Sequence, residues 1–162
     1  MAVGLRARFS SKDIEKLFAE KLAMIEAAIL SRFKRIGERF VNNARDNGNY
    51  VDQTGNLRSS IGYVILHNGT QIHENLKAYP ASGKKTANKS KKAGSQKAKQ
   101  MLDEVRKNYP RGFVLIVVAG MEYAAAVESK GKDVLTASSI TAEQELREAM
   151  TDIGKKITKI KK

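Results

Sequence analysis

The chain has 162 residues, of which 41% are hydrophobic, so it is long enough to form one domain with a real core. It contains no cysteine, which excludes disulfides, cysteine nucleophiles and thiolate metal sites. The longest apolar run, residues 114–120, is far shorter than a membrane span, and residues 1–9 lack the apolar stretch of a secretory signal behind them. We therefore expect a single soluble domain over residues 1–162, used in a cytosol-like compartment and not in a membrane.

The formal net charge of +13 is concentrated in two segments. Residues 77–107 hold ten Lys or Arg against two acids, and residues 155–162 hold five lysines and no acid. The rest of the chain is electrically balanced. Because residues 81–99 contain no large apolar side chain, we expect a mobile lysine-rich insertion there, and a basic C-terminal tail at 155–162.

The lysines of the insertion are candidate phosphate contacts, since lysine binds phosphate as a point charge. The insertion has no aromatic residue for stacking on single-stranded bases. Three readings stay open: a solvated loop, a contact with DNA, and a contact with an acidic protein. The candidate phosphate-contacting residues are Lys84, Lys85, Lys89, Lys91, Lys92, Lys97 and Lys99.

A long helix is the first predicted element, over residues 11–45. Ser10 or Ser11 can cap it, and a cluster of Asn, Asp and Gly after residue 41 ends it. Such a helix, roughly 50 Å long, exceeds what a domain of this size needs, so we expect part of its apolar stripe to rest on another subunit. The stripe recurs every three or four residues, at Ile14, Leu17, Phe18, Leu22, Ile25, Ile29, Phe33, Ile36 and Phe40.

A small antiparallel sheet is predicted next. A turn at residues 54–56 and a short helical turn at 56–60 lead into a hairpin, with strands at 62–66 and 71–77 around Asn68-Gly69. A short amphipathic helix follows near residues 95–108. The β-branched run 113–119 has the pattern of a central strand that is covered on both faces.

The chain then continues as a strand or helical turn at 123–127 and ends in a helix over residues 139–160. The apolar stripe of that helix is predicted at Ile140, Leu146, Met150, Ile153, Ile157 and Ile160. The pattern as a whole predicts an α+β fold: a long N-terminal helix, a small antiparallel sheet with an inserted basic loop and short helix, and a C-terminal helix.

Catalytic motifs are not apparent in the sequence. His67 and His73 flank the hairpin and could face each other, but a metal site would also need a carboxylate such as Glu74. Glu122 and Glu128 could be imagined as an acid/base pair, although a salt bridge or a helix cap suits each better. We therefore expect no enzymatic activity, no metal and no cofactor.

Two segments carry a resemblance to a known family. The first is Tyr50-x-Asp52-x-Thr54-Gly55-Asn56-Leu57-Arg58-Ser59-Ser60-Ile61, and the second begins Gly120-Met121-Glu122-Tyr123-Ala124-Ala125-Ala126-Val127-Glu128. In this order, between a long helix and a closing helix, they resemble the head–tail joining (tail-completion) proteins of long-tailed bacteriophages and prophages, also described as neck, minor tail or minor capsid components. The resemblance covers most of the chain except the lysine-rich insertion.

The resemblance implies a structural virion protein that is made in the bacterial host cytoplasm. Its subunits would form a ring, usually a hexamer, between the neck adaptor and the tail tube or tail terminator proteins, with non-specific contact to DNA in the channel. Gly55 would adopt a backbone conformation that a branched residue disfavours. The alternative is a basic nucleic-acid-binding protein that uses the lysine-rich loop and tail. The candidate subunit-interface residues are Thr54, Gly55, Leu57, Tyr123, Ala124, Val127 and Glu128.

Overall fold

A computed structural model of the chain describes residues 9–50, 52, 55–79, 87–122 and 124–159, with the backbone alone for 87–92 and 159. It confirms the α+β fold. Helix α1 (Ser11–Asp46) is followed by α2 (Asn56–Ser59), strands β1 (Ile61–His67) and β2 (Thr70–Asn75), and helix α3 (Ala87–Val105). A short 3-10 turn (Arg106–Asn108), β3 (Phe113–Ala119), α4 (Ala124–Ser129) and α5 (Thr136–Lys159) complete the order.

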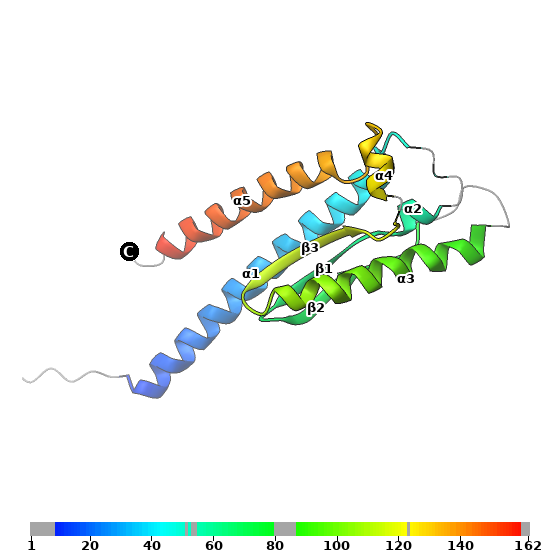
Figure 1. Ribbon diagram of the computed structural model, residues 1–162. Helices are drawn as coiled ribbons and strands as arrows, with labels where there is room; N and C mark the ends of the chain where they lie inside the picture. The colour runs from blue at the N-terminus through cyan, green and yellow to red at the C-terminus, as the bar shows by residue number, and fades with distance from the viewer. Residues whose placement is uncertain (1–8, 51, 53–54, 80–86, 123, 160–162) are drawn as a thin grey trace, which may run out of the picture.

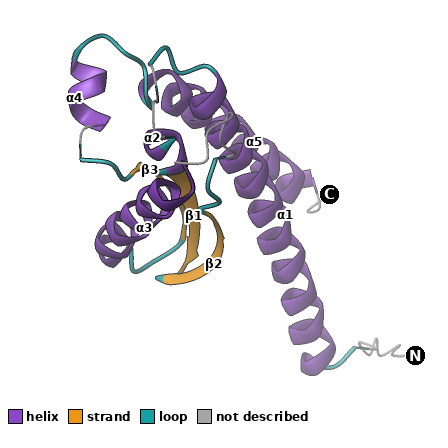
Figure 2. Ribbon diagram, turned by 90° about the vertical axis from the view of Figure 1, so that its right-hand side faces the viewer, coloured by secondary structure: helices purple, strands orange, loops and turns teal. Residues whose placement is uncertain are grey.

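The elements form three layers, with α1 and α5 on one face of the sheet and α3 on the other (Figures 1 and 2). The antiparallel sheet has the strand order β2-β1-β3, and Ile61 of β1 pairs with Ala119 of β3. The predicted hairpin is confirmed: Asn68 and Gly69 both have positive φ, 50° and 76°, which is the geometry that an Asn-Gly turn favours.

The centre of the sheet is β1, because its side chains are buried on both faces. Tyr63 and Ile65 join the core beneath α1, whereas Val64 and Leu66 join a second core beneath α3. The prediction that residues 113–119 form the central strand was therefore wrong in position. Both faces of β3 contribute to the two cores, but β3 lies at an edge of the sheet and is only partly buried.

Helix α3 corrects the expectation of a loop over residues 81–99 and a helix only from residue 95. The helix begins at Ala87, since Lys, Ala and Gln are strong helix formers. It packs through small residues: Ala98 is 1% exposed, and a Cβ on Gly120 would lie 2.3 Å from the Ala98 nitrogen. A segment without large apolar side chains is thus held against the sheet by close backbone approach.

Helix α5 begins three residues earlier than predicted because two carboxylates cap its first turn. Glu128 accepts a hydrogen bond from the Thr136 N–H at 2.9 Å, and Asp133 accepts one from the Ala137 N–H at 3.1 Å. Its buried face also differs from the predicted stripe. Ile153 is buried, but Ile140 and Met150 are exposed, and Ala149 takes a buried position instead.

Polar side chains join α1 to the sheet. The buried guanidinium of Arg45 donates to the carbonyl oxygens of Ile61 and Lys77, at 2.7 and 2.6 Å. Burial lowers the pKa of Arg45, but these two acceptors keep the cation hydrogen-bonded. The Glu38 carboxylate accepts from the Tyr63 hydroxyl at 2.9 Å and from the Asn75 amide at 2.8 Å. The C-terminal half of α1 is therefore fixed firmly to the domain.

Candidate protein-interaction surface

The N-terminal part of α1 extends beyond α5 and the sheet (Figures 1 and 2). We call residues 11–24 the overhang, because every one of them is exposed, whereas Ile25 is the first partly buried residue of the helix. The overhang corresponds to about 20 Å of helix. A capping box fixes its start: the Asp13 N–H donates to the Ser10 hydroxyl, and Asp13 accepts from the Ser10 N–H at 2.8 Å.

The overhang carries the apolar stripe of the core out into solvent. Phe33 is 3% exposed and Ile29 is 9% exposed, but on the same stripe Leu22 is 57% and Phe18 is 71% exposed. Single apolar residues on a surface are ordinary, but a contiguous row of them marks an interaction site. The expectation that part of the stripe rests on another subunit remains a prediction, and the exposed residues of the overhang are the part to which it applies.

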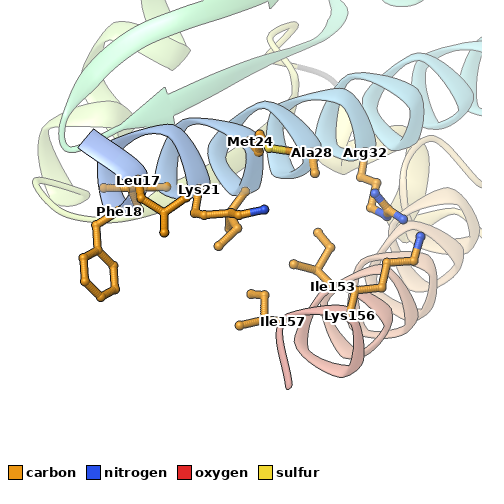
Figure 3. A pocket seen from close by; sticks show the side chains of 11 residues that line it. Leu17, Phe18, Lys21, Met24, Ala28, Arg32, Ile153, Lys156 and Ile157 are labelled. Carbon is orange, nitrogen blue, oxygen red and sulfur yellow. The ribbon is translucent and has the colours of Figure 1, made fainter. Parts of the chain in front are cut away.

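A groove forms where the overhang passes the C-terminal end of α5 (Figure 3). It has a volume of about 560 Å³, and its floor is apolar, with Leu17 and Leu22 of α1 beside Ile153 and Ile157 of α5. Its lining also includes Lys21, Arg32 and Lys156, and no acidic residue among those described. The groove therefore suits an amphipathic helix that carries acidic residues beside its apolar stripe.

The opposite side of the overhang is polar. Lys12, Lys16 and Glu20 lie along it, Glu15 borders the apolar stripe near Leu22, and all four are exposed. The pKa of Asp13 is lowered because the Ser10 N–H and hydroxyl donate to its carboxylate. The overhang is thus an amphipathic helix whose first turn carries Asp13, a position at which an acid is favourable to the helix dipole.

The predicted subunit-interface residues that the structure describes lie outside the overhang and the groove. Three of them pack against the core of the domain. Leu57 is 2% and Ala124 is 7% exposed, and Val127 packs against the same core. Leu57 and Ala124 therefore pack into the core of this domain, Val127 is partly buried, and their role in a subunit interface stays a prediction. Gly55 has φ 74°, the left-handed conformation expected of it, at the start of α2. Thr54 and Tyr123 lie outside the described residues.

Glu122 and Glu128 do not form an acid/base pair. The Lys97 ammonium lies 2.8 Å from the Glu122 carboxylate, and this contact lowers the pKa of Glu122 and raises that of Lys97. Burial alone would raise the pKa of Glu128, but hydrogen bonds from the Thr136 hydroxyl and from backbone N–H groups outweigh it and lower the pKa. The expected salt bridge and helix cap are both confirmed.

The lysine-rich segment is described only in part. Lys84 and Lys85 lie outside the described residues, and Lys89, Lys91 and Lys92 are placed by their backbone alone, on α3. Lys97 is paired with Glu122, and Lys99 is exposed on the same helix. The expected basic tail is also helical as far as Lys159, because α5 continues to that residue.

The two histidines do not face each other across the hairpin. His73 is opposite Ile65, and its Nε2 lies 3.1 Å from the Tyr63 hydroxyl. His67 stacks on Phe113 with ring centroids 4.1 Å apart. Burial and then Lys34 lower the pKa of His73, so its surroundings favour the neutral form of the ring. Across the part of the chain that the structure describes, no three His, Asp or Glu side chains lie close enough together to hold a metal ion.

Sequence reasoning missed three features of these surfaces. It overlooked the cations at the rim of the groove, although their spacing from the apolar stripe was readable. It also overlooked Arg45, because no periodicity in the sequence indicates that this side chain is buried. The third missed feature is the guanidinium of Arg58, whose central carbon lies 5.3 Å from the ring centroid of Tyr50 and 5.6 Å from that of Tyr79. Burial raises the pKa of Tyr50 to about 12, so its hydroxyl stays protonated and the cluster has a structural role.

Within the described residues, none of the helices combines the length and the apolar character that crossing a membrane requires. Searches of protein-family models, of curated proteins and of solved structures found no match to this chain.

Proposed function

We propose that this protein is a structural component of a bacteriophage virion, a neck or tail-completion protein that assembles into a ring at the head–tail interface. Its partners would be further copies of itself, the neck adaptor, and the tail tube or tail terminator proteins. The protein would be made in the host cytoplasm and finish in the virion. The order of the two motif segments between a long and a closing helix supports this assignment.

The observation that carries the proposal is the overhang with its groove. A helix of 36 residues exceeds the length that its own domain covers, and its free end presents Leu17, Phe18 and Leu22 to solvent. Fully burying a side chain of this size contributes roughly 1.5–3 kcal/mol, and these three are already partly covered, so their burial supports association without by itself fixing an affinity. An exposed apolar surface of this extent supports the proposal that another protein binds the overhang and its groove.

The positive charge fits a channel-facing role better than a dedicated DNA-binding site. Lys97 is already neutralised by Glu122, and Lys99 stands exposed on a regular helix with no aromatic side chain within the 87–100 segment. Lysines arranged in this way contact phosphates without reading bases. The alternative, a nucleic-acid-binding protein, requires recognition of a particular sequence or structure.

Assembly and DNA binding together test the proposal. Negative-stain electron microscopy and sedimentation velocity of the concentrated protein should show closed rings, and antibody labelling of intact virions should mark the junction of head and tail. DNA binding, titrated with salt, should be independent of sequence and fall steeply as salt rises. Sequence-selective binding that survives physiological salt, without labelling of virions, would replace the neck role with the alternative.

A further inference from the structure

Two cations from different helices face each other at the end of the groove that is farther from Phe18. Figure 3 shows the charged end of Arg32 on α1 turned toward that of Lys156 on α5, and Lys21 follows further along the same groove. Like charges that face each other repel, and an anion placed between them removes this cost. This end of the groove is therefore suited to a carboxylate.

The acids of the chain itself do not neutralise these cations. All 17 Asp and Glu residues lie in the part of the chain that the structure describes. None of them forms an ion pair with Lys21, Arg32 or Lys156. The acids nearest in sequence to the two lysines, Glu20 and Asp152, do not line the groove. A ligand from outside the chain can therefore supply the missing negative charge.

The α1 side of the groove has the spacing of a helix-packing seam. Its lining includes residues at steps of three or four along α1, so one side of the helix faces the groove throughout. This row covers about 22 Å, or four helical turns. A helix packs against such a row by interdigitation of side chains, and a small residue in the row leaves room for a large one. The row consists of Leu17, Lys21, Met24, Ala28 and Arg32.

We propose that the groove binds an acidic amphipathic helix of another protein, about four turns long. The apolar side chains of that helix pack on Ala28 and Ile157, and one of its carboxylates bridges Arg32 and Lys156. A second carboxylate, about three turns away on the same face, reaches Lys21, because Lys21 and Arg32 are 11 residues apart. The inference rests on the proposed function in its claim that another protein covers the overhang, and it adds the chemistry of that protein.

Two other occupants match the groove less well. The overhang of a second copy carries three acids and three lysines, so it brings no net negative charge to the three cations. An anionic alkyl chain brings one charge, whereas the cations occupy two places about 16 Å apart along α1. An acidic helix supplies both charges together with the apolar stripe between them.

Fluorescence anisotropy with two labelled peptides of about five helical turns tests the charge. Both peptides carry the same leucine stripe, and one has glutamates beside the stripe where the other has lysines. At physiological ionic strength the Glu peptide should bind the parent about tenfold more tightly than the Lys peptide. Lys21→Glu/Lys156→Glu should invert this preference, because it reverses two of the three charges in the lining.

A matched variant separates the groove from the overall charge of the protein. Lys16→Glu/Lys155→Glu makes the same change in net charge on the same two helices, but neither residue lines the groove. This control should keep the preference of the parent for the Glu peptide. All four lysines are exposed, so the thermal midpoints of the two variants should agree with that of the parent. Equal binding of both peptides by the parent, or an equal effect of the two variants, would overturn the proposal.

A steric pair of variants tests where the peptide binds. Ala28→Phe fills the groove, whereas Ala27→Phe adds the same ring at an exposed neighbour outside the lining. Only Ala28→Phe should abolish binding of the Glu peptide. Displacement of the peptide by dodecanoate, or a dimer of the parent that only Ala28→Phe abolishes, would assign the groove to another occupant and overturn the proposal. Rings without peptide binding reject only the acidic helix, and peptide binding without rings rejects only the neck role.

Discussion

Two glycines in the middle of helices should respond to alanine with opposite signs. Gly154 lies in α5 with no atom within 4 Å of an added Cβ, so Gly154→Ala should stabilise the protein by about 1 kcal/mol through helix propensity alone. Gly94 lies in α3, where an added Cβ would be 2.4 Å from the Asn56 carbonyl oxygen and 3.2 Å from the Ser59 Cβ. A backbone oxygen cannot swing aside as a flexible side chain can, so α3 must move.

The magnitude follows from these distances. Overpacking costs roughly 1–3 kcal/mol, and the contact with a backbone oxygen places Gly94 at the upper end of that range; after the same gain in propensity of about 1 kcal/mol, Gly94→Ala should destabilise the protein by up to about 2 kcal/mol. The two variants should therefore differ by the overpacking cost, up to about 3 kcal/mol, or up to roughly 6–12 °C in Tm for a chain of this length. Urea denaturation followed by far-UV circular dichroism measures the difference. If Gly94→Ala proved as stable as Gly154→Ala, α3 would not be packed on α2, and the expectation of a mobile loop would return.

Phe33→Asp should cost about 4 kcal/mol or more and abolish cooperative folding, because Phe33 is 3% exposed and meets the Phe113 ring edge-on at 6.1 Å; thermal denaturation checks this. Glu128→Gln should lower stability by about 1 kcal/mol at pH 7 by weakening the cap on α5. The lowered pKa of Glu128 gives stability that is present above about pH 4.5 and lost as pH falls through the folded pKa, so the variant should show a flatter acid limb in pH-dependent denaturation. Replacing five lysines by Gln should reduce the slope of log K against log salt for DNA by about 0.9 for each phosphate that the variant no longer binds, and an unchanged slope in filter binding would mean that they do not touch DNA. These lysines are Lys84, Lys85, Lys89, Lys91 and Lys92.

Periodicity and turn chemistry predicted the fold where the signal is local. The 3.6-residue stripe places α1 to within one residue of its end, and the Asn68-Gly69 pair identifies the hairpin. The order of strands in the sheet is not a local property. Residues 113–119 and 61–66 are both apolar runs, and only tertiary packing decides that β1 lies in the centre.

The N-terminal part of helix α3 was not predicted because it packs through residues with very small side chains. Large apolar residues indicate burial in a sequence. Gly94 and Ala98 instead let the backbone of α3 approach that of α2 and that of Gly120, and such small residues leave no periodic signal. The burial of two predicted interface residues was missed for a related reason. Leu57 and Ala124 belong to motif segments that were judged as surfaces, although a segment of small and apolar residues serves equally well in a core.

The stripe of α1 shows how one sequence pattern can serve two partners. From Ile29 to Phe40 it is buried beneath the sheet and α5. From Ile14 to Leu22 it has the same spacing, but none of the described residues covers it. The difference lies in the lengths of the two helices, because α5 runs antiparallel to α1 from Thr136 and its end reaches only the groove. A shorter α1 would have satisfied the domain, so the additional turns carry no benefit to folding and expose apolar surface at a cost. Exposed apolar rows of this kind are typical of interaction surfaces, so association of the overhang with another chain remains the prediction that these additional turns support.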